Sequence, residues 1–307
     1  MIAKGEGYFA RVRKSDGAFE GLWRIETHQA CRLDVTGSLS VFTAELGEDI
    51  WTTLDRQTPW LKPEAPDVFH RLVLEPGQCF PRMARPALGR NWRAAIWSEG
   101  ADKNAVAKAH GQLLALARQL DRICQTVHPS PDNFGAYGHD IRNLLILACT
   151  EVESQWRGVL EANGYSPQRP GRFTTTDYVK ICSAMGLTEY SVRFPSYPWL
   201  EPIHPFERWG VGIAPTADIP WYDAYNAAKH DRENEFARAT LLRVFEAMSA
   251  NVVMLCAQYG TSETFGRGPE IKALFSFEAM PQWSPAEMYV DPGLAGIAKW
   301  TSTNYKF

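Results

Sequence analysis

The densest cluster of chemically useful side chains in this 307-residue chain lies between positions 221 and 232. Asn226 and His230 are four residues apart, so on a helix they share one face. The imidazole of His230 titrates near neutral pH and can accept or donate a proton. Lys229 and Arg232 flank it with positive charge that suits a phosphate group. This pattern predicts a polar corner that binds a phosphate ester and transfers a proton.

The same corner also has a purely structural explanation. A histidine in the last turn of a helix is stabilised by the helix dipole when it is protonated, and His230 is expected in such a turn. RNA cleavage without a metal requires a base for the 2′-hydroxyl, an acid for the leaving oxygen and cations for the charged transition state. The residue types at the corner meet these requirements, so the sequence leaves open both a structural and a catalytic role.

An Asn-x-x-Lys-His corner between two helices resembles the HEPN superfamily, a group of helical-bundle domains found in bacterial toxins, defence proteins and RNases. The family motif has an arginine, then a polar residue, then a histidine a few residues later. Aligned on His230, the polar position falls on Asn226 and the arginine position falls on Tyr225. The resemblance covers about residues 138–260.

This resemblance implies a function as well as a fold. We expect the corner to bind or cleave RNA, with Asn226 and His230 as the catalytic residues of a metal-independent endoribonuclease. HEPN domains commonly dimerise with their polar corners facing each other, which implies a homodimer with a composite site at the two-fold axis. A bacterial toxin or phage-defence setting follows from the family. The alternative is a non-catalytic HEPN-like domain whose corner serves interaction or ligand binding.

A second polar cluster follows position 138, at the expected start of another helix. His139 and Asn143 share a face there, and Arg142 lies beside them. If the two helices pack side by side, Arg142 can supply the cation that Tyr225 does not provide. The predicted phosphate- or ligand-binding residues are therefore Lys229, Arg232, Arg142, Tyr225 and His139.

Two glutamates on this second helix are expected to have different surroundings. Glu151 and Glu153 are two residues apart and cannot share a helical face. We expect Glu151 to reach Lys229 or Arg232 across the bundle, and Glu153 to lie on a solvated face.

Four segments of the chain have apolar residues at the helical period over several turns. They are residues 102–128, 139–162, 219–231 and 235–259. Each has a single apolar stripe that must be buried, so we expect the four helices to pack as one antiparallel bundle. Asn234 is the expected cap of the last helix and Gly260 its expected end. A shorter helix is expected between Thr174 and Gly186.

The first hundred residues are expected to be rich in β-strands. Alternating residues on either side of Asp16-Gly17 predict a hairpin of strands at 8–13 and 19–25. Shorter strands are expected at residues 31–35, 39–42, 69–74 and, beyond this region, 190–194.

The predicted fold class is therefore α+β. A β-rich region at 1–100 precedes an HEPN-like helical bundle at 101–262, and a tail at 263–307 packs back on the N-terminal region. Residues 271–277 and 287–290 of this tail are expected to form strands.

The N-terminal region contains a candidate site of its own. One segment mixes arginines with tryptophans in a way that suits phosphate contact and base stacking. Its members are Arg82, Arg85, Arg90, Arg93, Trp92 and Trp97. A solvated loop whose tryptophans fill a domain junction explains the same residues. The sequence thus leaves open that the N-terminal sheet, and not the helical corner, carries the activity.

Composition narrows the function classes further. A net charge of −3 argues against binding of nucleic acid or membrane over the whole surface, although a local basic site is compatible with it. The six cysteines include no Cys-x-x-Cys pair and no metal or cofactor motif occurs, so we expect free thiols and neither a metal nor a cofactor. No apolar stretch approaches about 18 residues and the first residues contain no signal core, which predicts a cytoplasmic protein without a membrane segment.

Overall fold

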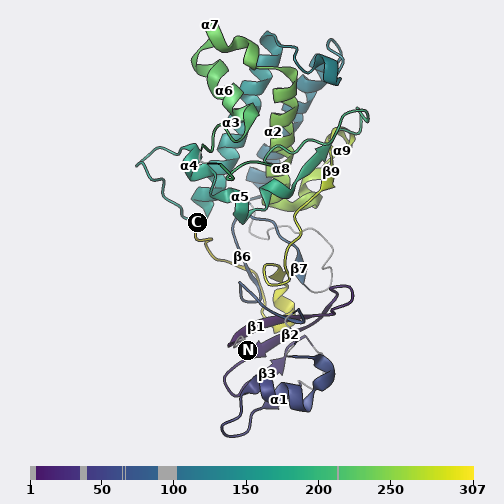
Figure 1. The fold of residues 1–307 in the computed structure, drawn as a ribbon, viewed down its shortest axis with the longest axis vertical. Helices are drawn as coiled ribbons and strands as arrows, with labels where there is room; N and C mark the ends of the chain where they lie inside the picture. The colour runs from purple at the N-terminus through teal and green to yellow at the C-terminus, as the bar shows by residue number, and fades with distance from the viewer. Residues whose placement is uncertain (1–4, 35–39, 64, 66, 89–101, 213) are drawn as a thin grey trace. The chain divides into compact units, whose positions relative to one another are not determined.

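The chain forms two units and passes between them several times. The computed structural model describes residues 5–34, 40–63, 65, 67–88, 102–212 and 214–307. One unit comprises Met1–Cys79, Arg85–Ile96 and Trp283–Thr303, and the other comprises Phe80–Ala84, Trp97–Gln282 and Asn304–Phe307. The first holds an antiparallel sheet and the second most of the helices (Figure 1), so the protein is α+β as predicted. The segment predicted as a tail, 263–307, is shared between the two units.

The sheet of the N-terminal unit is antiparallel throughout, in the order β4-β3-β2-β1-β5. Its strands are β1 (Gly7–Val12), β2 (Phe19–Ile25), β3 (Gln29–Arg32), β4 (Val41–Thr43) and β5 (Phe69–Arg71). The predicted hairpin is confirmed: β1 pairs with β2, and Gly17 at the turn has a φ of 66°, a value that favours glycine. Residues 35–39, which include parts of two predicted strands, lie outside the described residues.

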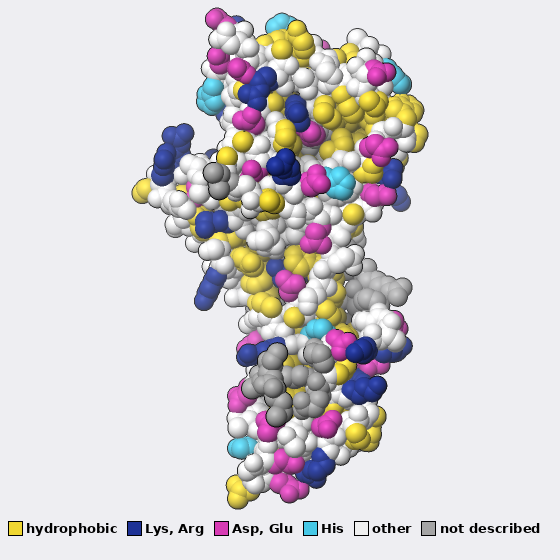
Figure 2. Space-filling model, viewed as in Figure 1, with side chains coloured by type: hydrophobic (Ala, Val, Ile, Leu, Met, Phe, Trp, Pro, Cys, Tyr) yellow, Lys and Arg dark blue, Asp and Glu magenta, His cyan; other side chains and the backbone are white. Residues whose placement is uncertain are grey.

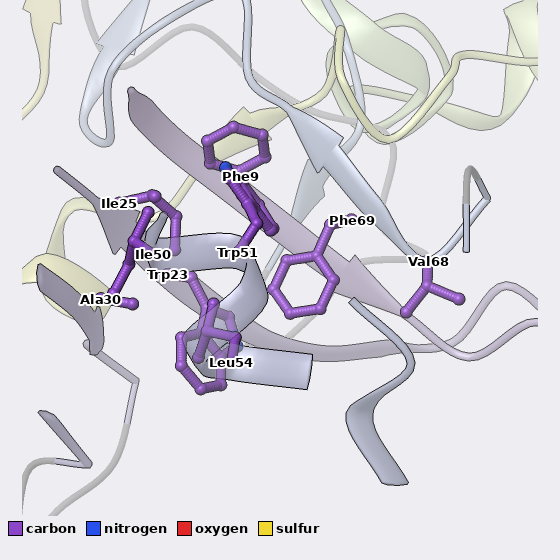
Figure 3. Packing of buried hydrophobic residues seen from close by; sticks show 9 residues of the cluster. All are labelled: Phe9, Trp23, Ile25, Ala30, Ile50, Trp51, Leu54, Val68 and Phe69. Carbon is purple, nitrogen blue, oxygen red and sulfur yellow. The ribbon is translucent and has the colours of Figure 1, made fainter. Parts of the chain in front are cut away.

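One face of this sheet is covered by helix α1 (Ile50–Gln57), which the sequence did not predict. Asp49 caps the helix by accepting hydrogen bonds from the backbone N–H groups of Trp51 and Thr52. The ring of Trp51 meets Phe9 and Phe69 edge to face, with centroids 5.1 and 5.6 Å apart (Figure 3). This aromatic packing forms the core of the unit, because the buried face of the sheet would otherwise be exposed to water.

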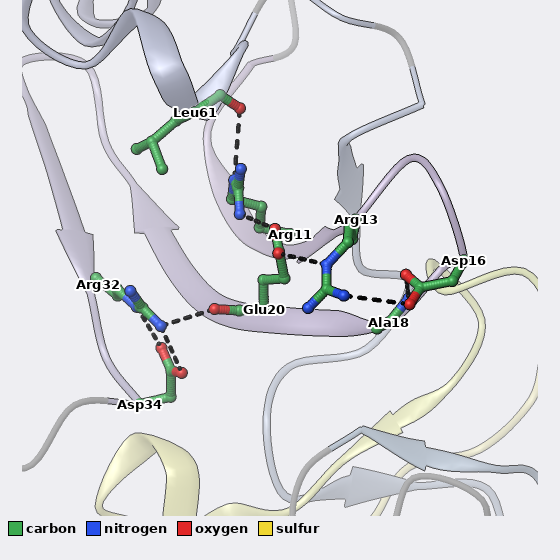
Figure 4. Close-up of polar contacts among 8 residues, drawn as sticks. All are labelled: Arg11, Arg13, Asp16, Ala18, Glu20, Arg32, Asp34 and Leu61. Atoms are coloured by element: carbon green, nitrogen blue, oxygen red, sulfur yellow. Dashed lines mark hydrogen bonds and ion pairs between the residues drawn. The ribbon is translucent and has the colours of Figure 1, made fainter.

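Charged side chains on the sheet are paired with one another (Figure 4). Arg11 and Arg13 both contact Glu20, and Arg13 also contacts Asp16 at 3.2 Å. Arg32 contacts Asp34 at 3.1 Å and donates a hydrogen bond to the carbonyl oxygen of Glu20. These three arginines are therefore neutralised in place and do not present a free cationic surface.

The remaining strands of the N-terminal unit are short and parallel. Strand β10 (Tyr289–Val290) pairs with β7 (Ala87–Leu88), and β11 (Thr301–Ser302) pairs with β6 (Gln78–Cys79). The predicted strand at 287–290 is therefore present, but its partner is β7 and not the five-stranded sheet.

Of the arginine- and tryptophan-containing segment, the structure describes only Arg82 and Arg85, and these two belong to different units. Arg85 is buried in the N-terminal unit, where its guanidinium lies 4.4 Å from the ring centre of Trp283. Arg82 belongs to the helical unit, where it donates hydrogen bonds to Gln258. The other four members of the segment, at positions 90, 92, 93 and 97, lie outside the described residues.

Four helices dominate the helical unit. They are α2 (Lys103–Cys124), α3 (His139–Ala162), α6 (Pro220–His230) and α8 (Leu241–Phe265). Helix α8 lies against the other three, and α3 lies against both α2 and α6. The prediction that these four segments pack together is confirmed, and each buries the apolar stripe seen in the sequence.

The last helix differs from the prediction at both ends. It begins at Leu241 and not near 235, because α7 (Arg232–Glu235) and a 3₁₀ turn (Phe236–Arg238) occupy the preceding residues. Asp231 caps the short helix α7, because its carboxylate accepts a hydrogen bond from the backbone N–H of Asn234; the N-cap position of α8 is Thr240 and not Asn234. Gly260 breaks the helix with a φ of 85°, but helical structure resumes and continues to Phe265.

Helix α8 is long and apolar enough to cross a membrane by length and composition alone. However, 83% of its most apolar window is buried inside the unit, which is typical of the core helix of a soluble protein.

Shorter elements complete the helical unit. The predicted helix between 174 and 186 is divided into α4 (Thr175–Tyr178) and α5 (Ile181–Ala184). Strand β8 (Ser191–Arg193), also predicted, pairs with β9 (Ser276–Ala279). The prediction of one strand at 271–277 is wrong for its first part, where Pro269 begins α9 (Pro269–Leu274).

Candidate functional site

Helix α6 positions the predicted corner through its apolar stripe. Trp221, Tyr225 and Ala228 are buried at intervals of four and three residues, which fixes the rotation of the helix against α3 and α8. Lys229 and His230 follow in the last turn and are exposed. The backbone leaves the helical region at Asp231, so the polar corner, residues 226–232, lies at the C-terminal end of α6.

Asn226 and His230 lie one helical turn apart, as predicted, but they are not bonded to each other. The amide Nδ2 of Asn226 donates a hydrogen bond to the carbonyl oxygen of Tyr222 at 3.1 Å. The side chain of His230 is exposed and, among the described residues, makes no hydrogen bond or ion pair. Its imidazole is thus accessible to a ligand from solvent.

Arg142 reaches the same helix end from α3. Its Nε and Nη2 atoms donate hydrogen bonds to the carbonyl oxygen of Ala228 at 3.2 and 2.9 Å. Helices α3 and α6 run side by side (Figure 1), which is the condition under which Arg142 was expected to join the corner. The guanidinium caps the negative end of the helix dipole two residues before His230.

Tyr225, which the sequence resemblance aligned with an arginine, is completely buried and belongs to a hydrogen-bonded network with Glu153, Tyr222 and Lys229. Its hydroxyl accepts a hydrogen bond from Lys229 Nζ at 2.8 Å and donates one to Glu153 at 3.4 Å. Tyr222 donates a second hydrogen bond to the same carboxylate. We call these four residues the tyrosine–glutamate network.

Two pKa shifts follow from this network. The hydrogen bond from Lys229 to the Tyr225 hydroxyl raises the pKa of that ammonium group, so Lys229 remains charged. Burial, followed by the hydrogen bond to Glu153, raises the pKa of the Tyr222 phenol well above its ordinary value. The Tyr222 phenol therefore keeps its proton near neutral pH.

The expectations for the two glutamates are both wrong. Glu153 does not lie on a solvated face, because it accepts hydrogen bonds from the two tyrosines of α6. Glu151 does not reach Lys229 or Arg232; it accepts a hydrogen bond from Gln155 at 3.2 Å. Glu153 follows Cys149 and Val152 on the buried side of α3, and this spacing was the signal in the sequence that could have placed it.

His139 and Arg232 lie at the edge of the corner. The ring of His139 contacts that of Phe236, with centroids 5.1 Å apart, so the first residue of α3 touches the 3₁₀ turn after α7. Arg232 begins α7 and is exposed, and the described part of the chain provides it with no ion-pair partner. Of the nearby carboxylates, Asp231 accepts hydrogen bonds from Asn234 and Glu235 pairs with Arg238, while Glu233 is exposed.

The structure thus brings together Arg142, Tyr225 and Lys229 around the last turn of α6. His230 and Arg232 follow in sequence but are directed to solvent without side-chain partners among the described residues. Asn226 is partly buried one turn before them. This arrangement has the chemistry to hold an anion with three cations and to move a proton with one imidazole.

The described residues contain no group of three or more His, Cys, Asp or Glu side chains arranged to hold a metal ion. All six cysteines are free thiols. Comparison of the chain with known protein families, curated protein sequences and solved structures gives no match.

Proposed function

We propose that the helical unit is an HEPN-like bundle whose polar corner binds RNA and that His230 transfers a proton in its cleavage. The observation that carries this proposal is the placement of Arg142, whose guanidinium lies on the last turn of α6. A cation from a second helix there supplies the positive charge that the buried Tyr225 does not provide.

The charge of the corner favours a phosphate group. Arg142, Lys229 and Arg232 bring three positive charges to this helix end, and these outnumber the nearby carboxylates Asp231 and Glu233. The Nη1 atom of Arg142 makes no hydrogen bond within the described residues and remains available as a donor. A phosphodiester that binds here replaces water around three cations, which supports affinity without sequence-specific contacts.

The chemistry of cleavage follows from the imidazole. Neutral His230 accepts the proton of a ribose 2′-hydroxyl, whose oxygen attacks the adjacent phosphorus while the bond to the 5′-oxygen of the next nucleotide breaks. The products are a 2′,3′-cyclic phosphate and a free 5′-hydroxyl, which takes up a proton from an acid. Arg142 and Lys229 stabilise the extra negative charge on the phosphate in the transition state.

A homodimer supplies this acid within the same proposal. With two corners facing across a two-fold axis, the imidazolium of the second copy's His230 lies opposite the base. Light scattering at micromolar concentration is then expected to give the mass of a dimer, and a strict monomer would eliminate the composite site. The setting in the same proposal is a bacterial toxin or phage-defence protein in the cytoplasm.

The alternative is a non-catalytic HEPN-like interaction or ligand-binding domain, and one observation favours it. The tyrosine–glutamate network holds the Lys229 ammonium against Tyr225, at 2.8 Å from the hydroxyl and 4.9 Å from the ring centre. A lysine held this way stabilises the fold and keeps only part of its charge available to a ligand.

An Arg232→Ala variant tests RNA binding at the corner. Because Arg232 is exposed, its replacement should leave the fold intact and weaken binding of a labelled oligouridylate several-fold. The slope of log Kd against log salt should fall by about 0.7, the value for one phosphate contact on a single strand. Arg118→Ala, an exposed arginine on α2, is the matched control. Equal affinities of the two variants, or a wild type that binds no RNA, would refute the proposal.

A further inference from the structure

The loop between α3 and α4 ends in a tight turn that presents two arginines. The turn is Arg169-Pro-Gly-Arg172, closed by a hydrogen bond from the N–H of Arg172 to the carbonyl of Arg169 at 3.0 Å. Pro170 presets its own φ and Gly171 adopts a φ of 73°, the combination of a type II turn. Both arginines are exposed, and neither has an ion-pair partner in the described parts of the chain. We call residues 169–172 the arginine turn.

A buried carboxylate holds the base of this loop. Asp177 is fully buried and accepts four hydrogen bonds, from the hydroxyl of Tyr165, the N–H of Gln168, and the N–H and hydroxyl of Thr174. Burial alone would raise the pKa of Asp177, but these donors outweigh it and hold the pKa below its ordinary value. The loop is therefore tied at its base by an ionised side chain, which limits the positions that the arginine turn can adopt.

Two further cations and several aromatic rings lie at the base of the loop. The guanidinium of Arg157 lies 5.7 Å from the ring centre of Phe173, and the ammonium of Lys180 lies 5.7 Å from that of Tyr165. Figure 2 shows dark blue side chains at the left of the view, where the loop between α3 and α4 projects in Figure 1. Cations interleaved with aromatic rings suit contact with phosphates and stacking on bases.

A polar stripe on α3 connects this loop with the corner. The exposed positions of the helix recur at intervals of three and four residues, so they lie on one face. They are His139 and Asp140 in the first turn, then Asn143, Leu147, Thr150, Ser154, Arg157 and Glu161. Between Asn143 and Arg157 these exposed positions carry no carboxylate; Asp140 and Glu161 lie near the two ends of the stripe. The 24 residues of α3 span about 36 Å, the length of about ten stacked nucleotides.

We propose that the arginine turn, with Arg157 and Lys180, binds the phosphodiester backbone of an RNA strand that runs along α3 toward the corner. The inference rests on the proposed function for the identity of its ligand. Two guanidinium groups on a tied turn match consecutive phosphates better than a small anion, which would need convergent donors in a pocket. The absence of exposed carboxylates between Asn143 and Arg157 limits electrostatic repulsion of the strand along the middle of α3.

The test removes both arginines of the turn. Arg169→Ala/Arg172→Ala is compared with Arg118→Ala/Arg122→Ala, which removes the same charge from an exposed face of α2. With an oligouridylate of about 20 nucleotides, the turn variant should bind about tenfold more weakly than wild type, with a salt slope lower by about 1.4. The control variant should bind nearly as wild type does. Arg169→Lys/Arg172→Lys should bind with intermediate affinity, because lysine keeps the charge and loses the planar fork.

The outcomes separate this inference from the proposed function. If the turn and control variants bind equally while Arg232→Ala weakens binding, the turn is not a contact and the corner remains the site. If the turn variant alone loses affinity and wild type cleaves no RNA, the turn is a binding site and the proposed catalysis is wrong. The inference would be overturned if the turn variant lost binding to anionic phosphatidylserine vesicles but still bound RNA as wild type does. It would also be overturned if wild type bound no RNA.

Discussion

Tyr225 lies where the sequence resemblance predicted a cation, and its surroundings explain why a phenol fits there. The residue is completely buried, and a charged group at this depth would need full compensation. The phenol connects the exposed Lys229 to the carboxylate of Glu153 through two hydrogen bonds. The tyrosine at this position is visible in the sequence, but only the packing of α6 on α3 shows that Arg142 brings a cation to the same helix end.

Replacing Tyr225 with Phe should destabilise the protein by about 1 kcal/mol, because Lys229 and Glu153 each lose one hydrogen bond while the ring remains packed. The pKa of the Lys229 ammonium should fall, since its hydrogen bond to the hydroxyl is the main cause of its rise. Urea unfolding measures the first effect and NMR titration of the lysine the second. Tyr137→Phe, at a side chain that is 56% exposed, should change neither; equal stabilities of the two variants would exclude a role for the Tyr225 hydroxyl.

At the scale of elements, α3 and α8 are joined by a buried ladder of amide side chains. Gln155 of α3 donates to Asn251 at 3.3 Å and accepts from Gln258 at 3.0 Å. Arg82 closes the ladder by donating to the Gln258 amide oxygen, with Nε at 2.8 Å. Every amide in the ladder is buried and bonded, which fixes the register of the two helices more strictly than apolar packing alone.

Gly158 on α3 makes room for this arginine. A Cβ atom at position 158 would lie 1.9 Å from the Nη1 atom of Arg82, so Gly158→Ala should displace the guanidinium from Gln258. Loss of the charge-assisted hydrogen bond costs about 2 kcal/mol of stability. This is more than the gain of about 1 kcal/mol that alanine provides over glycine through its higher helix propensity. We expect a net destabilisation of about 1 kcal/mol in urea unfolding. In an Arg82→Ala background, Gly158→Ala should instead stabilise the protein by about 1 kcal/mol. If Gly158→Ala destabilised the protein in both backgrounds, the contact with Arg82 would not be the cause.

The sequence predicted elements well where local signals and burial agree. The β1–β2 hairpin and α3 have their predicted positions, because turn residues and a single apolar stripe each specify one structure. Helix α1 was missed because its eight residues are too few for a clear period, and its burial depends on Phe9 and Phe69 from distant strands. The start of α8 was misplaced because α7 and a 3₁₀ turn occupy residues 232–238, and the N-cap position of α8 is Thr240. The contacts of Arg142 and Glu153 depend on which helices are neighbours, and no local pattern contains that information.

Buried cysteine thiols predict that the whole molecule loses stability in alkaline solution. Burial raises the pKa of the Cys182 and Cys256 thiols to about 12 from an ordinary value near 9. The unfolded chain therefore releases these protons first, and the free energy of unfolding should fall as pH rises from about 9 toward about 12. Each thiol contributes a slope of about 1.4 kcal/mol per pH unit in this window. Urea midpoints measured in reducing buffer that stay constant from about pH 8 to about pH 11 would contradict the burial of these thiols.

The corner is the centre of the functional account, and single-turnover cleavage of RNA by His230→Ala tests it most directly. The variant removes the imidazole and leaves Arg142, Lys229 and Arg232, so the cleavage rate should fall by about 10²-fold or more while RNA affinity changes little. Because His230 is exposed at a helix end, its stability should change by no more than about 1 kcal/mol. His204→Ala, at another exposed histidine of the same unit, should cleave as wild type does. Cleavage by His230→Ala at the wild-type rate, or no cleavage by the wild type under any condition, would show that the corner is not a nuclease site.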